Sequence, residues 1–179
     1  ACMSEKKFIK FPDKLWFLSN KEARPIVEAL ERQWGFAEKL DYVFVRTATD
    51  NIYIVNRQFG ELDQDNLRFN NVGIYFCEIQ KLGDVRLSIE GSQIIGPKAI
   101  RNVLDIDDKQ ADLWMKGYEL ETTDESLKGY YIVRHGKDYM GCCYVVPGKK
   151  ILNYVPKARR IHATVTPIDQ EVEENDIPG

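Results

Sequence analysis

Histidine and cysteine are scarce in this sequence of 179 residues, which has two histidines and four cysteines. No two cysteines have the spacing of two to four residues that is typical of a zinc knuckle, and neither histidine has an obvious metal-binding partner in the sequence. We therefore expect no metal site, and we interpret the cysteines as buried, reduced thiols of a cytoplasmic protein. The residues concerned are Cys2, Cys77, Cys142, Cys143, His135 and His162.

Long apolar runs and a secretory signal are also lacking. The longest apolar runs have about strand length, well below the roughly 18 residues that a membrane helix needs, and the N-terminal residues are polar and charged. No glycine-rich turn joins a strand to a helix as a nucleotide-type cofactor site requires, and no specific Ser-His-Asp arrangement is visible. We therefore expect no membrane partner, no cofactor and no catalytic residue.

Charge is unevenly distributed along the chain. The whole sequence has a net charge of −3, yet the segment from Arg134 to Arg160 contains seven Lys or Arg residues and one acid, Asp138, so its own charge is +6. A basic segment that also carries tyrosines suits a phosphate backbone with unstacked bases. A second interpretation stays open, in which this segment is a core hairpin whose lysine-rich face is simply solvated.

The hydrophobic pattern predicts an α+β protein. A mixed basic and aromatic segment over residues 7–17 is interpreted as a short strand and a turn, and a helix over residues 20–34 should follow it. Ser19 and Glu22 have the spacing of a capping box, and Gly35 is a natural stop. Pro25 disturbs the start of this helix, so its first regular turn is expected either near Asn20 or at the proline.

Four strands are expected to follow in the same half of the chain. Two of them flank the turn-forming cluster 49–51 and should form a hairpin. Residues 84–90 alternate apolar and polar side chains, which predicts a strand with one buried face that ends at Gly91. The segment 59–70 is polar and rich in turn residues. The four predicted strands are residues 41–46, 52–55, 72–79 and 84–90.

The second half is expected to contain a short helix over residues 107–116, with Asp107 and Gln110 in capping-box spacing. Residues 118–121 should be extended, and residues 129–146 have the pattern of a hairpin around a Gly-Lys-Asp turn. An irregular basic connection and a last strand over 163–166 would complete a small barrel, and the acidic residues 169–179 should form a flexible tail. The predicted domains are residues 1–91, 92–166 and a tail over 167–179, with the boundary between Gly91 and Asn102.

The second half resembles a known family. The run from Asp107 to Leu120 resembles the helix and strand that open the PUA-like RNA-binding region at the C-terminus of Sun (Fmu) type RNA cytosine-5 methyltransferases. The following glycines and the 153–157 loop resemble that region's hairpin and its Asn-x-x-Pro-Lys signature, over roughly residues 72–162 in all. More loosely, the whole chain is similar to two-domain proteins that assist large ribosomal subunit assembly in archaea and eukaryotes. The matching residues are Gln110, Ala111, Trp114, Gly117, Gly129, Tyr130, Gly136, Gly141, Asn153, Tyr154, Val155, Pro156 and Lys157.

This resemblance implies a mixed N-terminal domain followed by a small PUA-like β-barrel that binds structured RNA. Enzymes of the family use one cysteine that follows proline and another that follows threonine, whereas the cysteines here follow Ala1, Phe76, Gly141 and Cys142. We therefore interpret the chain as a non-catalytic protein that binds rRNA or tRNA in ribosome biogenesis or RNA modification. The alternative is a protein-interaction adaptor, or an RNA-recognition subunit that works in trans with an RNA methyltransferase; a ribosome assembly factor is a further expected partner.

Nine residues form the predicted RNA-binding site. Seven of them are cations that would contact phosphates, with those of the 149–160 loop on one rim of a groove and those of the hairpin opposite. Tyr154 could stack on a splayed base, and Asn153 could read a base edge or brace its own loop. Tyr139 is expected to pack into the fold instead. The nine residues are Arg134, Lys137, Lys149, Lys150, Asn153, Tyr154, Lys157, Arg159 and Arg160.

Overall fold

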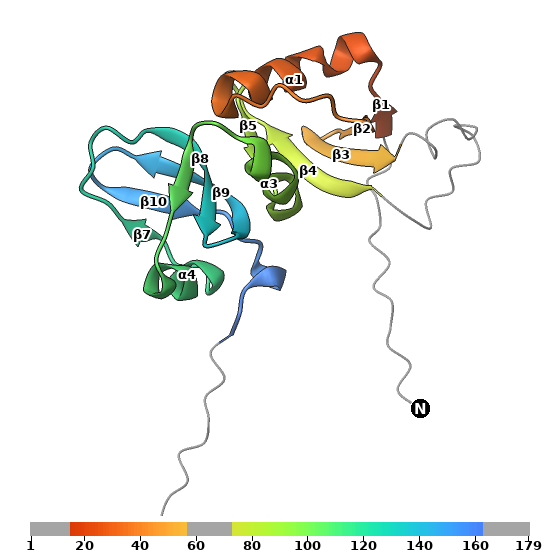
Figure 1. The fold of residues 1–179 in the computed structure, drawn as a ribbon. Helices are drawn as coiled ribbons and strands as arrows, with labels where there is room; N and C mark the ends of the chain where they lie inside the picture. The colour runs from red at the N-terminus through yellow and green to blue at the C-terminus, as the bar shows by residue number, and fades with distance from the viewer. Residues whose placement is uncertain (1–14, 57–72, 163–179) are drawn as a thin grey trace, which may run out of the picture.

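The computed structural model describes residues 15–56 and 73–162, which form two five-stranded sheets and three α-helices (Figure 1). This is the α+β composition that the hydrophobic pattern predicts. The sheet of the first half lies beside the sheet of the second half, and helix α3 (Ile89–Ile95) contacts β4 (Ile74–Ile79) of the first and β9 (Asp138–Val146) of the second.

The first sheet is antiparallel throughout, and its strands follow one another in chain order. Helix α1 (Asn20–Trp34) covers one face and buries Ile26, Leu30 and Trp34 against the strands. The hairpin predicted around residues 49–51 is confirmed. The strands are β1 (Leu15–Phe17), β2 (Tyr42–Thr47), β3 (Asn51–Asn56), β4 and β5 (Val85–Leu87).

Helix α1 begins where its capping box places it. The Ser19 side chain accepts a hydrogen bond from the backbone N–H of Glu22, and the Glu22 carboxylate accepts one from the backbone N–H of Ser19. These two bonds satisfy N–H groups that a helix start otherwise leaves unpaired. The first turn therefore starts near Asn20, and the alternative that it starts at Pro25 is wrong. Pro25 lies inside the helix, and Gly35, with φ +66°, caps the C-terminal end of the helix.

The strand predicted over residues 84–90 is confirmed only in its first half, and the second half begins a helix. Strand β5 ends at Leu87, because the Ser88 side chain accepts a hydrogen bond from the backbone N–H of Gly91 and caps helix α3. Gly91 does not end a strand but lies inside this helix. A Cβ there would lie 2.2 Å from the carbonyl oxygen of Phe76, so the missing side chain lets α3 pack directly on β4.

The second sheet has the strand order β6-β8-β9-β10-β7, with β6 and β8 parallel and the other pairs antiparallel. The hairpin predicted over residues 129–146 is confirmed as β8 and β9, and Gly136 lies in its turn with φ +59°. The short helix is confirmed as α4 (Asp108–Met115), which begins at the capping box of Asp107 and Gln110. The remaining strands are β6 (Val103–Asp105), β7 (Leu120–Glu121), β8 (Gly129–His135) and β10 (Lys150–Asn153).

The segment after the hairpin is more regular than predicted. Residues 150–153 pair with β9 as strand β10, because Gly148 adopts φ +63° and turns the chain back along the sheet. Only the part after Asn153 is irregular, apart from the short 3-10 helix η2 (Lys157–Arg159). A similar short turn, η1 (Gly96–Lys98), follows α3.

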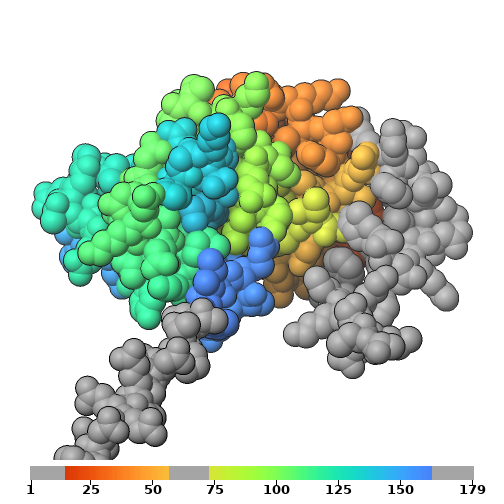
Figure 2. Space-filling model, turned by 60° about the horizontal axis from the view of Figure 1, so that its bottom comes forward, coloured from red at the N-terminus to blue at the C-terminus, as the bar shows by residue number. Residues whose placement is uncertain are grey.

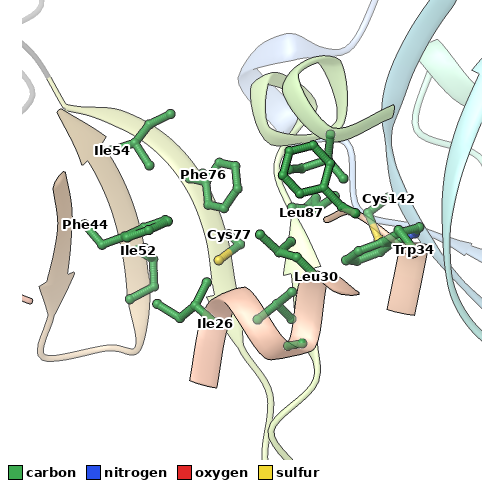
Figure 3. Packing of buried hydrophobic residues seen from close by; sticks show 14 of the residues in the cluster. Ile26, Leu30, Trp34, Phe44, Ile52, Ile54, Phe76, Cys77, Leu87 and Cys142 are labelled. Carbon is green, nitrogen blue, oxygen red and sulfur yellow. The ribbon is translucent and has the colours of Figure 1, made fainter. Parts of the chain in front are cut away.

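The hydrophobic core continues from one sheet to the other. One cluster combines α1, the first sheet and α3 with Ile132 and Cys142 of the second sheet, and Figure 3 shows Cys142 beside Trp34. Cys143 belongs to a second cluster around Trp114, so the two adjacent cysteines do point to opposite faces, as predicted for strand residues. Cys77, Cys142 and Cys143 are buried free thiols, as expected.

Some predictions concern residues outside the described ranges. These are the buried thiol of Cys2, the polar segment 59–70, the last strand over 163–166 and the acidic tail 169–179. In the described part, β6 and β7 are the edges of the second sheet, so closure of a barrel stays a prediction. The domain boundary between Gly91 and Asn102 also stays a prediction.

Candidate functional site

A groove of about 520 Å³ opens between the two halves of the molecule. One side is formed by β4, β5 and the start of α3, and the other by β9 and residues 154–159. We call this space the inter-sheet groove. In Figure 2 the last described residues, in blue, lie next to the place where the yellow and green segments meet. Buried apolar side chains, including Trp114, Cys142 and Val155, line its inner part.

An arginine and a tyrosine from opposite sides of the inter-sheet groove are stacked on each other. The guanidinium carbon of Arg86, on β5, lies 4.1 Å from the ring centroid of Tyr154, which follows β10. This is a cation–π distance. The same guanidinium forms an ion pair with Glu78 at 2.5 Å, which fixes its position. The two halves thus meet through a flat pair of stacked side chains whose charge is balanced by Glu78.

A second arginine reaches across the mouth of the groove. Arg159 Nη1 lies 2.5 Å from Glu90 Oε1, at the start of α3, and both side chains are partly exposed, at 50% and 35%. Exposed ion pairs of this kind contribute little to stability, because water and salt screen them. This contact can therefore exchange with other charged groups at low cost.

The phenol of Tyr75 adds a polar group to the groove. Burial, and to a smaller extent the nearby Glu78 carboxylate, raise the pKa of Tyr75 to about 12. The phenol is consequently neutral at physiological pH and can donate a hydrogen bond. In the structure its hydroxyl donates to Asn51 Oδ1 at 3.4 Å.

Asn153 braces the loop that carries Tyr154. Its Nδ2 donates to the carbonyl oxygens of Trp114 at 2.8 Å and Tyr118 at 2.9 Å, and its Oδ1 accepts a hydrogen bond from the backbone N–H of Val155 at 2.8 Å. Both amide hydrogens are therefore in use inside the protein. Of the two roles that the sequence leaves open for Asn153, the observed contacts support the bracing role.

Four of the predicted cations already have protein partners. The Arg134 guanidinium makes two contacts with the Asp105 carboxylate, at 2.6 and 2.8 Å, and Lys150 pairs with Glu119 at 2.9 Å. Arg160 donates to the carbonyl oxygen of Val155 and packs over Gly117. The fourth is Arg159, paired with Glu90. Within residues 15–56 and 73–162, the three exposed lysines Lys137, Lys149 and Lys157 form no ion pair.

The structure does not gather the seven cations on two rims of one groove. Lys137 lies in the β8–β9 turn and Lys149 in the β9–β10 turn, so the nine residues of β9 separate them by roughly 25 Å. Tyr154 and Arg159 do line one space, the inter-sheet groove, and Lys157 lies next to them on η2. These three residues, rather than the whole basic segment, form a local site.

From the sequence, Arg86 is only a second-choice RNA-binding candidate, together with Lys98 and Arg101 near the expected domain junction. Sequence reasoning missed Tyr75 and Glu90 as parts of this site. The alternation in residues 84–90 indicates only that Arg86 faces away from the core. Its contact with Tyr154 joins positions 68 residues apart, and no local spacing predicts such a contact. The described residues contain no group of three or more His, Cys, Asp or Glu side chains that could hold a metal ion. No described helix is long and apolar enough to cross a bilayer.

Comparisons with known proteins identify the class of the second half. Residues 101–161 match the family model of the methyltransferase RsmF PUA domain. Ribosomal RNA small subunit methyltransferase F of Aeromonas salmonicida (strain A449) is 31% identical to the chain over 140 residues, which are 78% of this chain and 28% of that protein. The predicted resemblance to the PUA-like region of RNA methyltransferases is thus confirmed. The chain spans little more than a quarter of that relative.

Proposed function

We propose that this chain binds RNA and that it does so in the modification of ribosomal RNA. The observation that carries the proposal is the match of residues 101–161 to a PUA domain of an RNA methyltransferase. The stacked Arg86 and Tyr154 and the cations of η2 support it, because aromatic rings and guanidinium groups are the side chains on which unpaired bases stack.

We also propose that the described part of the chain does not itself catalyse methyl transfer. A cysteine acts as a nucleophile through its thiolate, yet Cys77, Cys142 and Cys143 are all buried. Burial raises the pKa of Cys142 to about 12 and raises the pKa values of the other two thiols above their usual range. All three are protonated at neutral pH. Calorimetric titration of the chain with S-adenosylmethionine should give no saturable heat, and stoichiometric binding would contradict this proposal.

The salt dependence of RNA binding tests the proposed function. Each phosphate contact contributes about 0.7 to the slope of log affinity against log salt for single strands. Lys157→Gln should weaken binding to labelled single-stranded RNA and flatten that slope by about 0.7, because Lys157 is exposed beside the inter-sheet groove. Fluorescence anisotropy over a salt series measures both quantities.

Lys149→Gln is the matched control for this experiment. It removes the same charge from an exposed position at the far end of β9, and it should leave affinity and slope close to those of the wild type. If the wild-type chain binds RNA without a salt dependence, or does not bind it, the proposed function is wrong. A protein-interaction adaptor, which recognises another protein and not RNA, would show no salt-dependent RNA binding.

A further inference from the structure

We propose that the inter-sheet groove takes one unpaired ribonucleotide of a single-stranded RNA segment, with its base on the Arg86–Tyr154 stack and its phosphate at Arg159. This inference rests on the proposed function and goes beyond it, because it assigns the site to the junction of the two halves. Arg86 and Glu90 lie before residue 101, outside the part that matches the PUA domain.

The size and lining of the groove favour a single nucleotide. Its volume of about 520 Å³ falls within the range of small-molecule sites, and a duplex does not fit into such a space. The fully buried side chains of its lining are apolar, and the charged side chains of Glu90 and Arg159 are partly exposed to water. A nucleotide has the same division, with an apolar base face at one end and a charged phosphate at the other.

The stacked pair provides the platform for the base. The Arg86 guanidinium already lies over the Tyr154 ring, and its ion pair with Glu78 holds it there. The hydrogen bonds of Asn153 fix the chain next to Tyr154. A base that extends this stack meets a preformed surface, so little side-chain freedom is lost on binding.

The ion pair at the mouth provides the phosphate site. Arg159 pairs with the Glu90 carboxylate among the described residues, and both groups are accessible to water. A phosphate that approaches Arg159 replaces one anion with another and exchanges a weak surface pair for a charge-assisted contact. Glu90 competes for Arg159 and repels the phosphate, so it should lower the affinity for RNA.

Three variants test these assignments with a labelled, unstructured single-stranded RNA. Tyr154→Leu should weaken binding about 5- to 140-fold, the loss expected for one stacked base, while the salt slope stays that of the wild type. Arg159→Gln should weaken binding and flatten the slope by about 0.7. Glu90→Gln should tighten binding about 2- to 5-fold, because Arg159 loses its competing partner.

Matched controls separate this site from general effects. Tyr118→Leu removes an exposed tyrosine outside the groove and should leave affinity unchanged, and Tyr154→Phe should retain most of the binding. Equal melting temperatures of the variants show that folding is intact. Should Tyr154→Leu disturb folding, Glu90→Gln still tests the groove assignment, since it changes only a partly exposed side chain at the rim.

The outcomes distinguish this inference from the proposed function. Salt-dependent RNA binding that is unchanged in Tyr154→Leu and in Glu90→Gln would overturn the groove assignment and leave RNA binding in place. Absence of RNA binding in the wild type would remove both. Loss of binding in Tyr154→Leu together with a gain in Glu90→Gln supports the assignment.

Discussion

Trp114→Ala is expected to lower the free energy of unfolding by about 3–5 kcal/mol, the cost of truncating a large buried side chain. Trp114 has no exposed surface and packs in the second core cluster, on the inner side of α4. Its indole N–H donates to the carbonyl oxygen of Met140 on β9 at 2.8 Å. The substitution therefore opens a cavity beneath the second sheet and also removes the donor of a hydrogen bond.

Urea unfolding followed by circular dichroism measures this loss. Trp114→Phe is the matched control: it keeps an aromatic ring but removes the donor to Met140, and it should cost about 1–3 kcal/mol. A loss of less than about 1 kcal/mol for Trp114→Ala would show that α4 does not depend on this packing, and it would contradict the described core.

Trp34→Ala is expected to have a similarly large effect, about 3–5 kcal/mol. Trp34 is also fully buried, at the C-terminal end of α1 in the cluster that joins both sheets. Hydrogen bonds from residues 100–102 hold the same end of α1. The backbone N–H of Ile100 donates to the Trp34 carbonyl oxygen, and the side chains of Arg101 and Asn102 donate to the carbonyl oxygens of residues 31–33. The loss should therefore affect both sheets.

Hydrogen exchange of the Trp34→Ala variant tests this coupling. Protection should fall in β8 and β9 as well as in α1, because Ile132 and Cys142 belong to the same core cluster as Trp34. Retained protection in the second sheet would show that the two halves unfold independently. Trp34→Phe should cost less than Trp114→Phe, because no acceptor for the indole N–H of Trp34 is present among residues 15–56 and 73–162.

Local sequence signals predicted the elements that have local causes. The capping boxes at Ser19 and Asp107 placed both helix starts, since each involves residues only three positions apart. The turn at Gly136 and the two β-rich runs around it placed the β8–β9 hairpin for the same reason.

The errors have physical reasons too. Apolar side chains at 85, 87 and 89 fit a strand, and the sequence does not reveal that Ser88 caps a helix in between. Cations of the basic segment form ion pairs with acids from other parts of the chain, namely Asp105, Glu119 and Glu90. These pairs reduce the effective positive charge of the basic segment. Residues 101–161 carry eleven Lys or Arg and nine Asp or Glu, a net charge of only +2.

The groove could not be predicted because it depends on how the two halves meet. Arg86 and Tyr154 come together only after both sheets have formed and α3 has packed between them. Asn153 illustrates the same limit: its amide could serve RNA or the loop, and only the positions of the Trp114 and Tyr118 carbonyl groups indicate the loop.

Photocrosslinking of the unmodified chain tests most directly whether single-stranded RNA binds at the inter-sheet groove. RNA that carries 4-thiouridine would be crosslinked to the protein, digested and mapped by mass spectrometry. The crosslinked residues should fall in two segments that are far apart in the sequence, around Arg86 to Glu90 and around Tyr154 to Arg159. Crosslinks confined to α1 or to the β2–β3 hairpin, or none above the background of a non-binding protein, would contradict the account.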